Sequence, residues 1–198
     1  ALGTPRPGDA LFKDLNGDGV INGDDKTRFG YAERPDYVFG FLGGLKWKNF
    51  EFSMQWTAAM NASRILDGEY RNAFGSTNSR MLLKFLADER WTEENPNSRF
   101  PRLTFMNKSH YLQTSDLWLM NGSYLRLKTA EISYTLPQKD FLKKVGIESV
   151  RFYCNGYNLL TLFSDLNDID IDPEGVTDGE NNNYPNIRIY NFGVNISF

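Results

Sequence analysis

The chain has 198 residues and a formal net charge of −3, so its composition gives no basic surface for nucleic acid. No apolar run reaches the roughly 18 residues that a transmembrane helix needs, which excludes that class. Aromatic residues make up 15% of the chain although its mean hydropathy is −0.50. This combination is typical of a membrane β-barrel, whose strands are apolar on one side only.

The first predicted element is an acidic loop at residues 14–25, with the sequence DLNGDGVINGDD. Gly19 falls at position 6, where calcium-binding loops turn sharply. The oxygen donors fall at the offsets of such a loop: Asp14, Asn16, Asp18, Asn22 and Asp25 at positions 1, 3, 5, 9 and 12, and the Val20 carbonyl at position 7. Position 12 is Asp instead of Glu, which leaves bidentate ligation open.

The acidic loop therefore predicts a structural calcium ion that pins the chain ahead of the strand beginning at Tyr37. The alternative is a plain turn, because Asn-Gly and Asp-Gly pairs form turns without a metal. No second copy of the loop is present in the sequence.

Two long strands are predicted next, at residues 37–47 and 50–60. In the second, FEFSMQWTAAM, apolar and mainly polar side chains alternate along its whole length. A tilted strand that crosses a bilayer needs about 9–11 residues, so both strands are long enough. Only Lys48 and Asn49 separate them, which predicts a tight hairpin.

Three further strands are predicted at about residues 122–136, 149–162 and 187–198. The apolar residues of the first change parity, which predicts a β-bulge near Thr129 and Ala130. The second carries apolar residues on both parities, and the third alternates regularly. The sequence thus predicts an all-β fold with five antiparallel strands.

Short connections alternate with long polar ones, which span residues 61–118 and 164–186. Short turns at one end and long loops at the other are typical of membrane barrels. Within the first long connection, residues 79–91 predict a short amphipathic helix on the barrel rim, with an apolar face formed by Met81, Leu82, Phe85, Leu86 and Trp91. Within the second, the acidic stretch 165–174 is expected to be a solvated loop.

The sequence contains no catalytic constellation. Its one cysteine, Cys154, and one histidine, His110, are too few for a disulfide or a zinc site and leave little for a nucleophile–base pair. We expect Cys154 to be a small buried strand residue and His110 to lie on the surface. The chain is predicted not to be an enzyme.

Residues 115–137, SDLWLMNGSYLRLKTAEISYTLP, resemble the signature near the end of SusC/RagA-type TonB-dependent outer-membrane transporters of Bacteroidetes. The stretches PGDALFKDLNGDGVINGDD, ERWTEENPNSRFPRL and NGYNLLTLF are similar to the same family and occur in the same order. The resemblance implies a 22-stranded transmembrane barrel, of which this chain would supply the last five strands.

The resemblance also implies an orientation. Counted back from a periplasmic C-terminus, the strands place residues 1–36 and both long connections outside the cell. Residues 37–198 would then hold barrel strands and loops, with the plug domain absent from this chain. Five strands cannot close, since the smallest membrane barrels have eight. We therefore expect a piece of a longer or processed protein that pairs with an upstream segment.

The family implies import of oligosaccharides, or in some members peptides, across the outer membrane. The partners would be a SusD-like surface lipoprotein and TonB, the latter through the missing N-terminal part. Substrate contacts are expected from the loop aromatics Tyr70, Phe74 and Tyr111. Polar residues that would face the channel form a further candidate set: Gln55, Asn191 and Asn195.

The alternative from another class is a secreted calcium-dependent β-sandwich that binds carbohydrate. It would share the acidic loop, the strands and the aromatic residues. The two hypotheses differ at Phe52, Trp56 and Phe192. A sandwich buries these side chains between two sheets, whereas a membrane barrel turns them towards lipid.

Overall fold

The computed structural model describes residues 4–74, 82–105, 110, 112–175 and 186–198. The strands are β1 (Tyr37–Trp47), β2 (Phe50–Met60), β3 (Ser63–Ile65), β4 (Leu119–Asn121), β5 (Tyr124–Thr135), β6 (Ser149–Leu162) and β7 (Ile189–Ser197). The helices are α1 (Lys84–Asp88) and α2 (Asp140–Lys144), with short 3-10 turns η1 (Gly23–Asp25), η2 (Gly68–Tyr70), η4 (Asp116–Trp118) and η5 (Asp165–Ile169). No helix among these described residues is long and apolar enough to cross a membrane.

The described fold has two compact units. Unit 1 contains the described residues within 1–31 and 63–120, and unit 2 contains the described residues within 32–62, 121–175 and 184–198. The described residues up to 31 group with those of the first long connection, and the predicted boundary after residue 36, between an extracellular loop and the barrel strands, stays a prediction.

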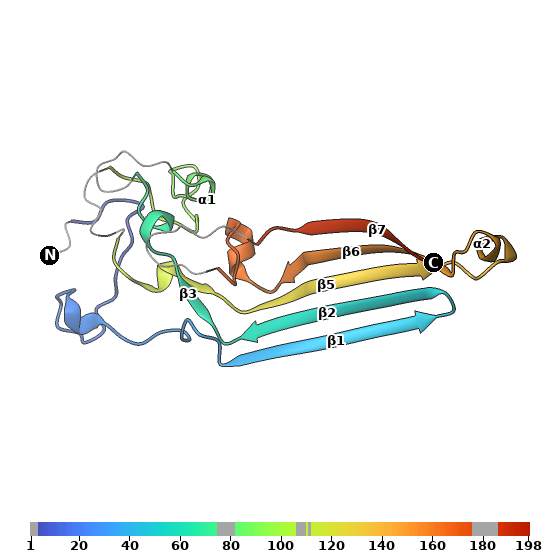
Figure 1. Cartoon of the computed structure of the whole chain (residues 1–198). Coiled ribbons are helices and arrows are strands. Elements are labelled where there is room, and N and C mark those ends of the chain that lie inside the picture. Colours follow the sequence, from blue (N-terminus) through green and yellow to red (C-terminus); the bar gives the residue numbers. More distant parts are fainter. Residues whose placement is uncertain (1–3, 75–81, 106–109, 111, 176–185) are drawn as a thin grey trace. The chain divides into compact units, whose positions relative to one another are not determined.

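Unit 2 is built on one antiparallel sheet with the strand order β1-β2-β5-β6-β7 (Figure 1). Strands β1, β2 and β6 have the predicted bounds, while β5 and β7 are shorter than predicted by a few residues at their ends. The β1–β2 turn, the α2 connection and the end of β7 share one end of the sheet. The long connections leave from the other end.

The β1–β2 hairpin follows directly from the local sequence. Its two turn residues lie between the paired residues Trp47 and Phe50, and Lys48 has φ +53, in the left-handed region that such turns require. The Asn49 side chain donates to the Thr135 carbonyl at 2.7 Å, which ties the turn to β5.

The predicted bulge in β5 is present, one residue earlier than expected. Leu127 pairs with Trp56, and Thr129 pairs with Gln55, so Lys128 is the extra residue. The register also shifts against β6 at this point, where Leu127 pairs with Leu160 and Thr129 with Tyr157, so that the extra residue there lies in β6. Because the bulge shifts the parity by one, apolar residues on both sides of it stay on one face of the sheet.

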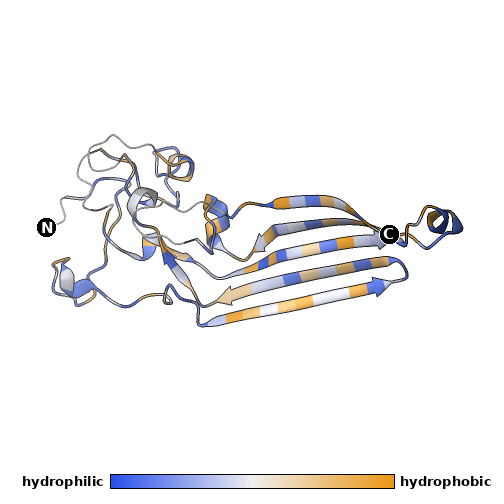
Figure 2. Cartoon of the chain, viewed as in Figure 1, coloured by the Kyte–Doolittle hydropathy of each residue, from blue (hydrophilic) through white to orange (hydrophobic). Residues whose placement is uncertain are grey.

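One face of the sheet is apolar and open. The register aligns a row across all five strands, formed by Leu45, Phe52, Ile132, Cys154 and Phe192, and Figure 2 shows apolar and polar blocks alternating along the strands. Phe52 is 38% exposed and Phe192 is 80% exposed. Cys154 is half-buried in this row, so the expectation of a buried cysteine is wrong.

These exposures do not favour the β-sandwich alternative, although the third residue named for the distinction, Trp56, is half-buried. The other sheet within the described residues is the β3–β4 pair, whose strands have three residues each. Such a pair is too small to cover five long strands. Apolar rows of this length without a covering protein layer are typical of a surface that faces lipid.

Unit 1 has a small aromatic core. The Phe100 ring stacks on Trp118 at a centroid distance of 5.6 Å and is tilted against Phe85 at 5.4 Å. Leu86 of α1 is fully buried. The helix is shorter than the predicted 79–91 because the chain leaves it to pair with the residues around Phe100: the Trp91 amide donates to the Phe100 carbonyl at 2.8 Å. The predicted face residue Met81 lies outside the described residues.

Candidate functional site

The acidic loop is closed by its own side chains. The Asp14 carboxylate accepts the backbone amides of Gly17 at 2.6 Å and Gly19 at 2.8 Å. Gly17 and Gly19 have φ +79 and +81, a backbone conformation that glycine adopts without strain. Asn16, Asp18 and Asn22 each accept the amide two residues further on, at 2.9, 2.7 and 2.6 Å. The loop therefore has the predicted turns, with the predicted donor side chains directed at its backbone.

Asp25 ties the two halves of the loop together. Its carboxylate accepts the amides of Leu15 and Asn22, each at 2.8 Å. The hydrogen bond from Asn22, followed by that from Leu15, holds the pKa of Asp25 below its ordinary value. Asn22 also caps η1 in a capping box with Asp25.

The assignment of a metal ion to this loop depends on amide and backbone carbonyl oxygens as well as on carboxylates. Within the part of the chain that the structure describes, no group of three or more His, Cys, Asp or Glu side chains is arranged to hold a metal ion. The predicted calcium set includes the amide oxygens of Asn16 and Asn22 and the carbonyl of Val20. An all-oxygen set of this kind suits a hard cation.

The segment before the loop is anchored inside unit 1. Asp9 pairs with Arg102 at 2.6 Å, and its side chain is 9% exposed. Burial alone would raise the pKa of Asp9, but hydrogen bonds from Arg102 and from the Arg6 amide outweigh it, so the pKa lies below its ordinary value. Gly8 has φ +83 and lies so close to the Trp91 ring that no side chain would fit there.

His110 belongs to the same anchored region, which corrects the expectation that it lies on the surface. It is 7% exposed, and its ring stacks on Phe12 at a centroid distance of 6.4 Å. An aromatic neighbour 98 positions away in the chain gives no local signal, so the sequence pattern could not reveal this contact.

The three predicted substrate aromatics are only partly described. Tyr70 is the last residue of η2 and is half-buried. Phe74 stacks on Phe105 at a centroid distance of 4.2 Å, and Phe105 is 57% exposed. Tyr111 lies outside the described residues. A substrate role for these residues stays a prediction.

The polar face of the five-stranded sheet carries a ladder of hydrogen-bonded side chains. Glu131 accepts from Arg151 at 2.6 Å and from Asn155 at 3.1 Å, and Asn155 accepts from Asn191 at 2.9 Å. The ladder places Asn191, one of the candidate channel residues, in a row that spans β5, β6 and β7. These side chains form hydrogen bonds with one another, which holds them in position.

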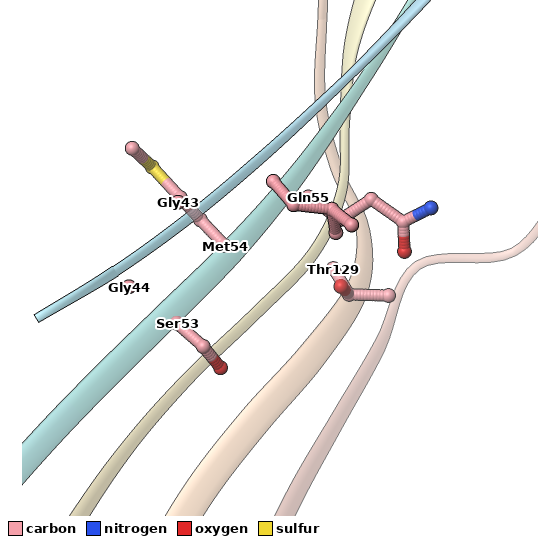
Figure 3. A pocket seen from close by; sticks show the side chains of 7 residues that line it. Gly43, Gly44, Ser53, Met54, Gln55 and Thr129 are labelled. Atoms are coloured by element: carbon pink, nitrogen blue, oxygen red, sulfur yellow. The ribbon is translucent and has the colours of Figure 1, made fainter.

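A hollow of about 300 Å³ lies next to this ladder, between β1, β2 and β5. Its polar-face lining includes Gln55, Ser53 and Thr129, whose side chains lie on one side of the strands while Met54 points to the other (Figure 3). Leu42 also lines the hollow and is 77% exposed. The alternation of the strands therefore puts the predicted channel residue Gln55 on the polar face.

Residues 164–175, which we call the post-β6 segment, belong to unit 2 and fold against its sheet. Leu166, Ile169 and Ile171 in it are 0%, 4% and 9% exposed. Asp172 forms an ion pair with Arg126 of β5 at 2.7 Å. The expectation of a solvated loop at 165–174 is therefore wrong. In the sequence, the feature that indicates this burial is the presence of the three apolar residues Leu166, Ile169 and Ile171 among the acidic ones.

No protein-family model matches the chain. The sequence is 31% identical over 208 residues to TonB-dependent receptor P3 of Formosa agariphila, an alignment that covers 99% of this chain and 20% of the receptor. It is 33% identical over 202 residues to TonB-dependent receptor P26 of the same organism, with 96% and 20% covered. The chain thus spans about one fifth of the length of these curated relatives.

Solved structures agree with the sequence comparison. The structure of the RagAB peptide transporter matches with a TM-score of 0.64 and 27% identity, covering 90% of this chain and 19% of that one. The RagAB peptide importer in its "closed-closed" state matches with a TM-score of 0.66 and 27% identity, covering 97% and 20%. These relatives are receptors and transporters, which supports the prediction that the chain is not an enzyme.

Proposed function

We propose that this chain, which belongs to the SusC/RagA-type TonB-dependent transporters, supplies five wall strands to a channel that imports nutrients. The chain lies in the outer membrane as part of a β-barrel. The observation that carries the proposal is the open apolar face of the sheet: Phe52, Phe192 and their row are exposed to the surroundings, and β1 and β2 each have 11 residues, enough to cross a bilayer.

The proposed wall cannot stand alone in a membrane. The outer edges of β1 and β7 pair with no strand among the described residues, and an unpaired backbone edge in lipid costs several kcal/mol per group. We infer that both edges pair with further strands of the same protein and close a barrel, for which 22 strands is the proposed number. Residues 1–36 and the two long connections would then lie outside the cell.

The proposed cargo is an oligosaccharide or a peptide. RagAB is described as a peptide transporter, which supports the peptide alternative, while the hydrogen-bonded polar face suits either class of solute. We further propose that a SusD-like surface lipoprotein captures the solute outside. TonB would supply energy through a part of the protein that lies beyond these residues.

Uptake in the native organism tests the proposal. A strain that lacks the full-length protein should lose uptake of one labelled class, mixed oligosaccharides or mixed peptides, and regain it when the gene is restored. Loss of peptide uptake alone would assign the cargo to peptides. Unchanged uptake of both classes would contradict the importer assignment.

We also propose that the acidic loop binds calcium. The support is the all-oxygen donor set at the predicted offsets and the loop closure by Asp14 and Asp25. Calcium would draw Asp14, Asp18 and Asp25 together and relieve the repulsion among their charges. Its role would be structural, since the loop lies ahead of β1 and carries no catalytic group.

A further inference from the structure

We infer that the post-β6 segment (residues 164–175) is a fixed part of the channel wall that narrows the channel mouth, and that a buried ion cluster centred on Arg126 holds it there. The inference rests on the proposed import function, because only a channel gives the polar face of the sheet a lumen to line. The inference goes beyond the import function because it names the residues that set the width of the channel opening.

The cluster joins two cations of β5 to two carboxylates of the segment. The Arg126 side chain, 3% exposed, lies 2.7 Å from Asp172 and 2.9 Å from Glu174. Lys128, the bulge residue, lies 2.8 Å from the same Glu174 oxygen. The Tyr124 hydroxyl donates to Glu174 at 3.1 Å. Three residues of β5 therefore converge on one short stretch of the connection.

The charges of the cluster balance, which fits a structural clamp better than a binding site for a charged solute. Two positive and two negative side chains leave no net charge to attract an ion. Buried charges are stable only when they are paired and hydrogen-bonded. Arg126 is held in this way at two of its nitrogens, since Nε donates to Thr161 at 3.0 Å and Nη2 to Asp172 at 2.7 Å, while Nη1 has the ion-pair contact with Glu174 alone.

A second, apolar anchor acts together with the ions. Leu166, Ile169 and Ile171 are buried, and the turn around them is closed by the Ile171 amide, which donates to the Leu166 carbonyl at 2.9 Å. Asp170 supplies the left-handed residue at φ +57 that ends η5. The segment thus has its own compact structure and does not depend on the cluster alone.

The strand register shows which face the segment covers. Arg126 pairs with Thr57 of β2 and with Thr161 of β6, residues whose parity is opposite to that of Phe52. The cluster therefore lies on the polar face, at the end of the sheet from which the long connections leave. If this face lines the channel, the segment reduces the opening at its mouth.

The test uses the full-length protein in outer-membrane vesicles. A cysteine is introduced as Gln55→Cys in a Cys154→Ser background, two β2 positions deeper than Thr57 on the polar face. Its reaction rate is measured with a small maleimide and with a maleimide on a polyethylene glycol chain. Release of the segment by Arg126→Met should raise the rate with the large reagent by more than about tenfold, and the rate with the small reagent much less.

Two further variants make the test decisive. Asp172→Asn combined with Glu174→Gln breaks the cluster from the loop side without touching a strand, and should give the same change even if Arg126→Met fails to assemble. Arg151→Met removes an ion pair of 2.6 Å with Glu131 on the same face that does not contact the segment, and should leave the ratio of the two rates at the parent value.

An unchanged large-reagent rate in the loop-side variant would overturn the inference, and so would an equal increase in Arg151→Met. Hydrogen exchange of the amides at 165–175 should rise in Arg126→Met and in the loop-side variant. Uptake by the parent protein is scored separately. An unchanged large-reagent rate in the loop-side variant together with normal uptake by the parent protein would contradict the wall role alone, whereas absent uptake by the parent protein would contradict the proposed function.

Discussion

At the scale of single residues, Asp9 and Asp25 fix the N-terminal segment by accepting hydrogen bonds as carboxylates. Both have a pKa below the ordinary value of 3.8. A carboxylate with a lowered folded pKa contributes stability above the unfolded pKa and loses it as the pH falls through the folded one. Protection of residues 9–25 should therefore be constant from neutral pH down to about pH 5 and fall below the ordinary value.

Amide hydrogen exchange of the full-length protein in detergent, corrected for its intrinsic pH dependence, measures this protection. Asp25→Asn keeps an oxygen acceptor but does not titrate, so the acid-induced loss around residues 15–22 should be weaker in that variant. Equal protection at pH 3 and pH 6 in the parent protein would contradict the role given to these two carboxylates.

At the scale of elements, the acidic loop should respond to calcium as one unit. Asp14→Asn removes the carboxylate that closes the first turns and should weaken calcium-dependent protection of residues 9–37 by more than about tenfold in calcium concentration. Asp24→Asn is the matched control, because Asp24 is an exposed acid of the same loop at no ligand offset. Limited proteolysis with calcium or with a chelator gives the readout.

The calcium proposal fails if the chelator leaves the proteolysis of the parent protein unchanged. It also fails if Asp24→Asn and Asp14→Asn have equal effects, since the response would then reflect loop charge instead of ligation. The plain-turn alternative predicts both of these results, because the loop already closes through its own hydrogen bonds.

The strands could be predicted from the sequence because their alternation is local. Strict period-2 patterns gave β1 and β2 their bounds, and the change of parity in β5 gave the bulge to within one or two residues. The post-β6 segment could not be predicted in this way. Its three apolar residues indicate burial, but its attachment to the sheet also uses Arg126, whose partner Asp172 is 46 positions away, and no local pattern encodes such a distant pairing.

At the scale of the whole molecule, the features of the sheet are those of one part of a larger barrel. Its apolar face is uncovered, its two edge strands have open outer edges among the described residues, and the chain spans about one fifth of its curated relatives. A soluble protein with these features would aggregate through its edges and its apolar rows. A bilayer and neighbouring strands remove both problems.

The central claim is that the apolar face contacts lipid, and fluorescence quenching tests it most directly. A fluorophore is attached to single cysteines introduced as Phe52→Cys, Phe192→Cys, Ser53→Cys or Asn191→Cys, in a Cys154→Ser background, in the full-length protein in liposomes. Probes at 52 and 192 should be quenched by a spin-labelled lipid, and probes at 53 and 191 by iodide in the water. Strong iodide quenching at 52 and 192, without lipid quenching, would contradict the account.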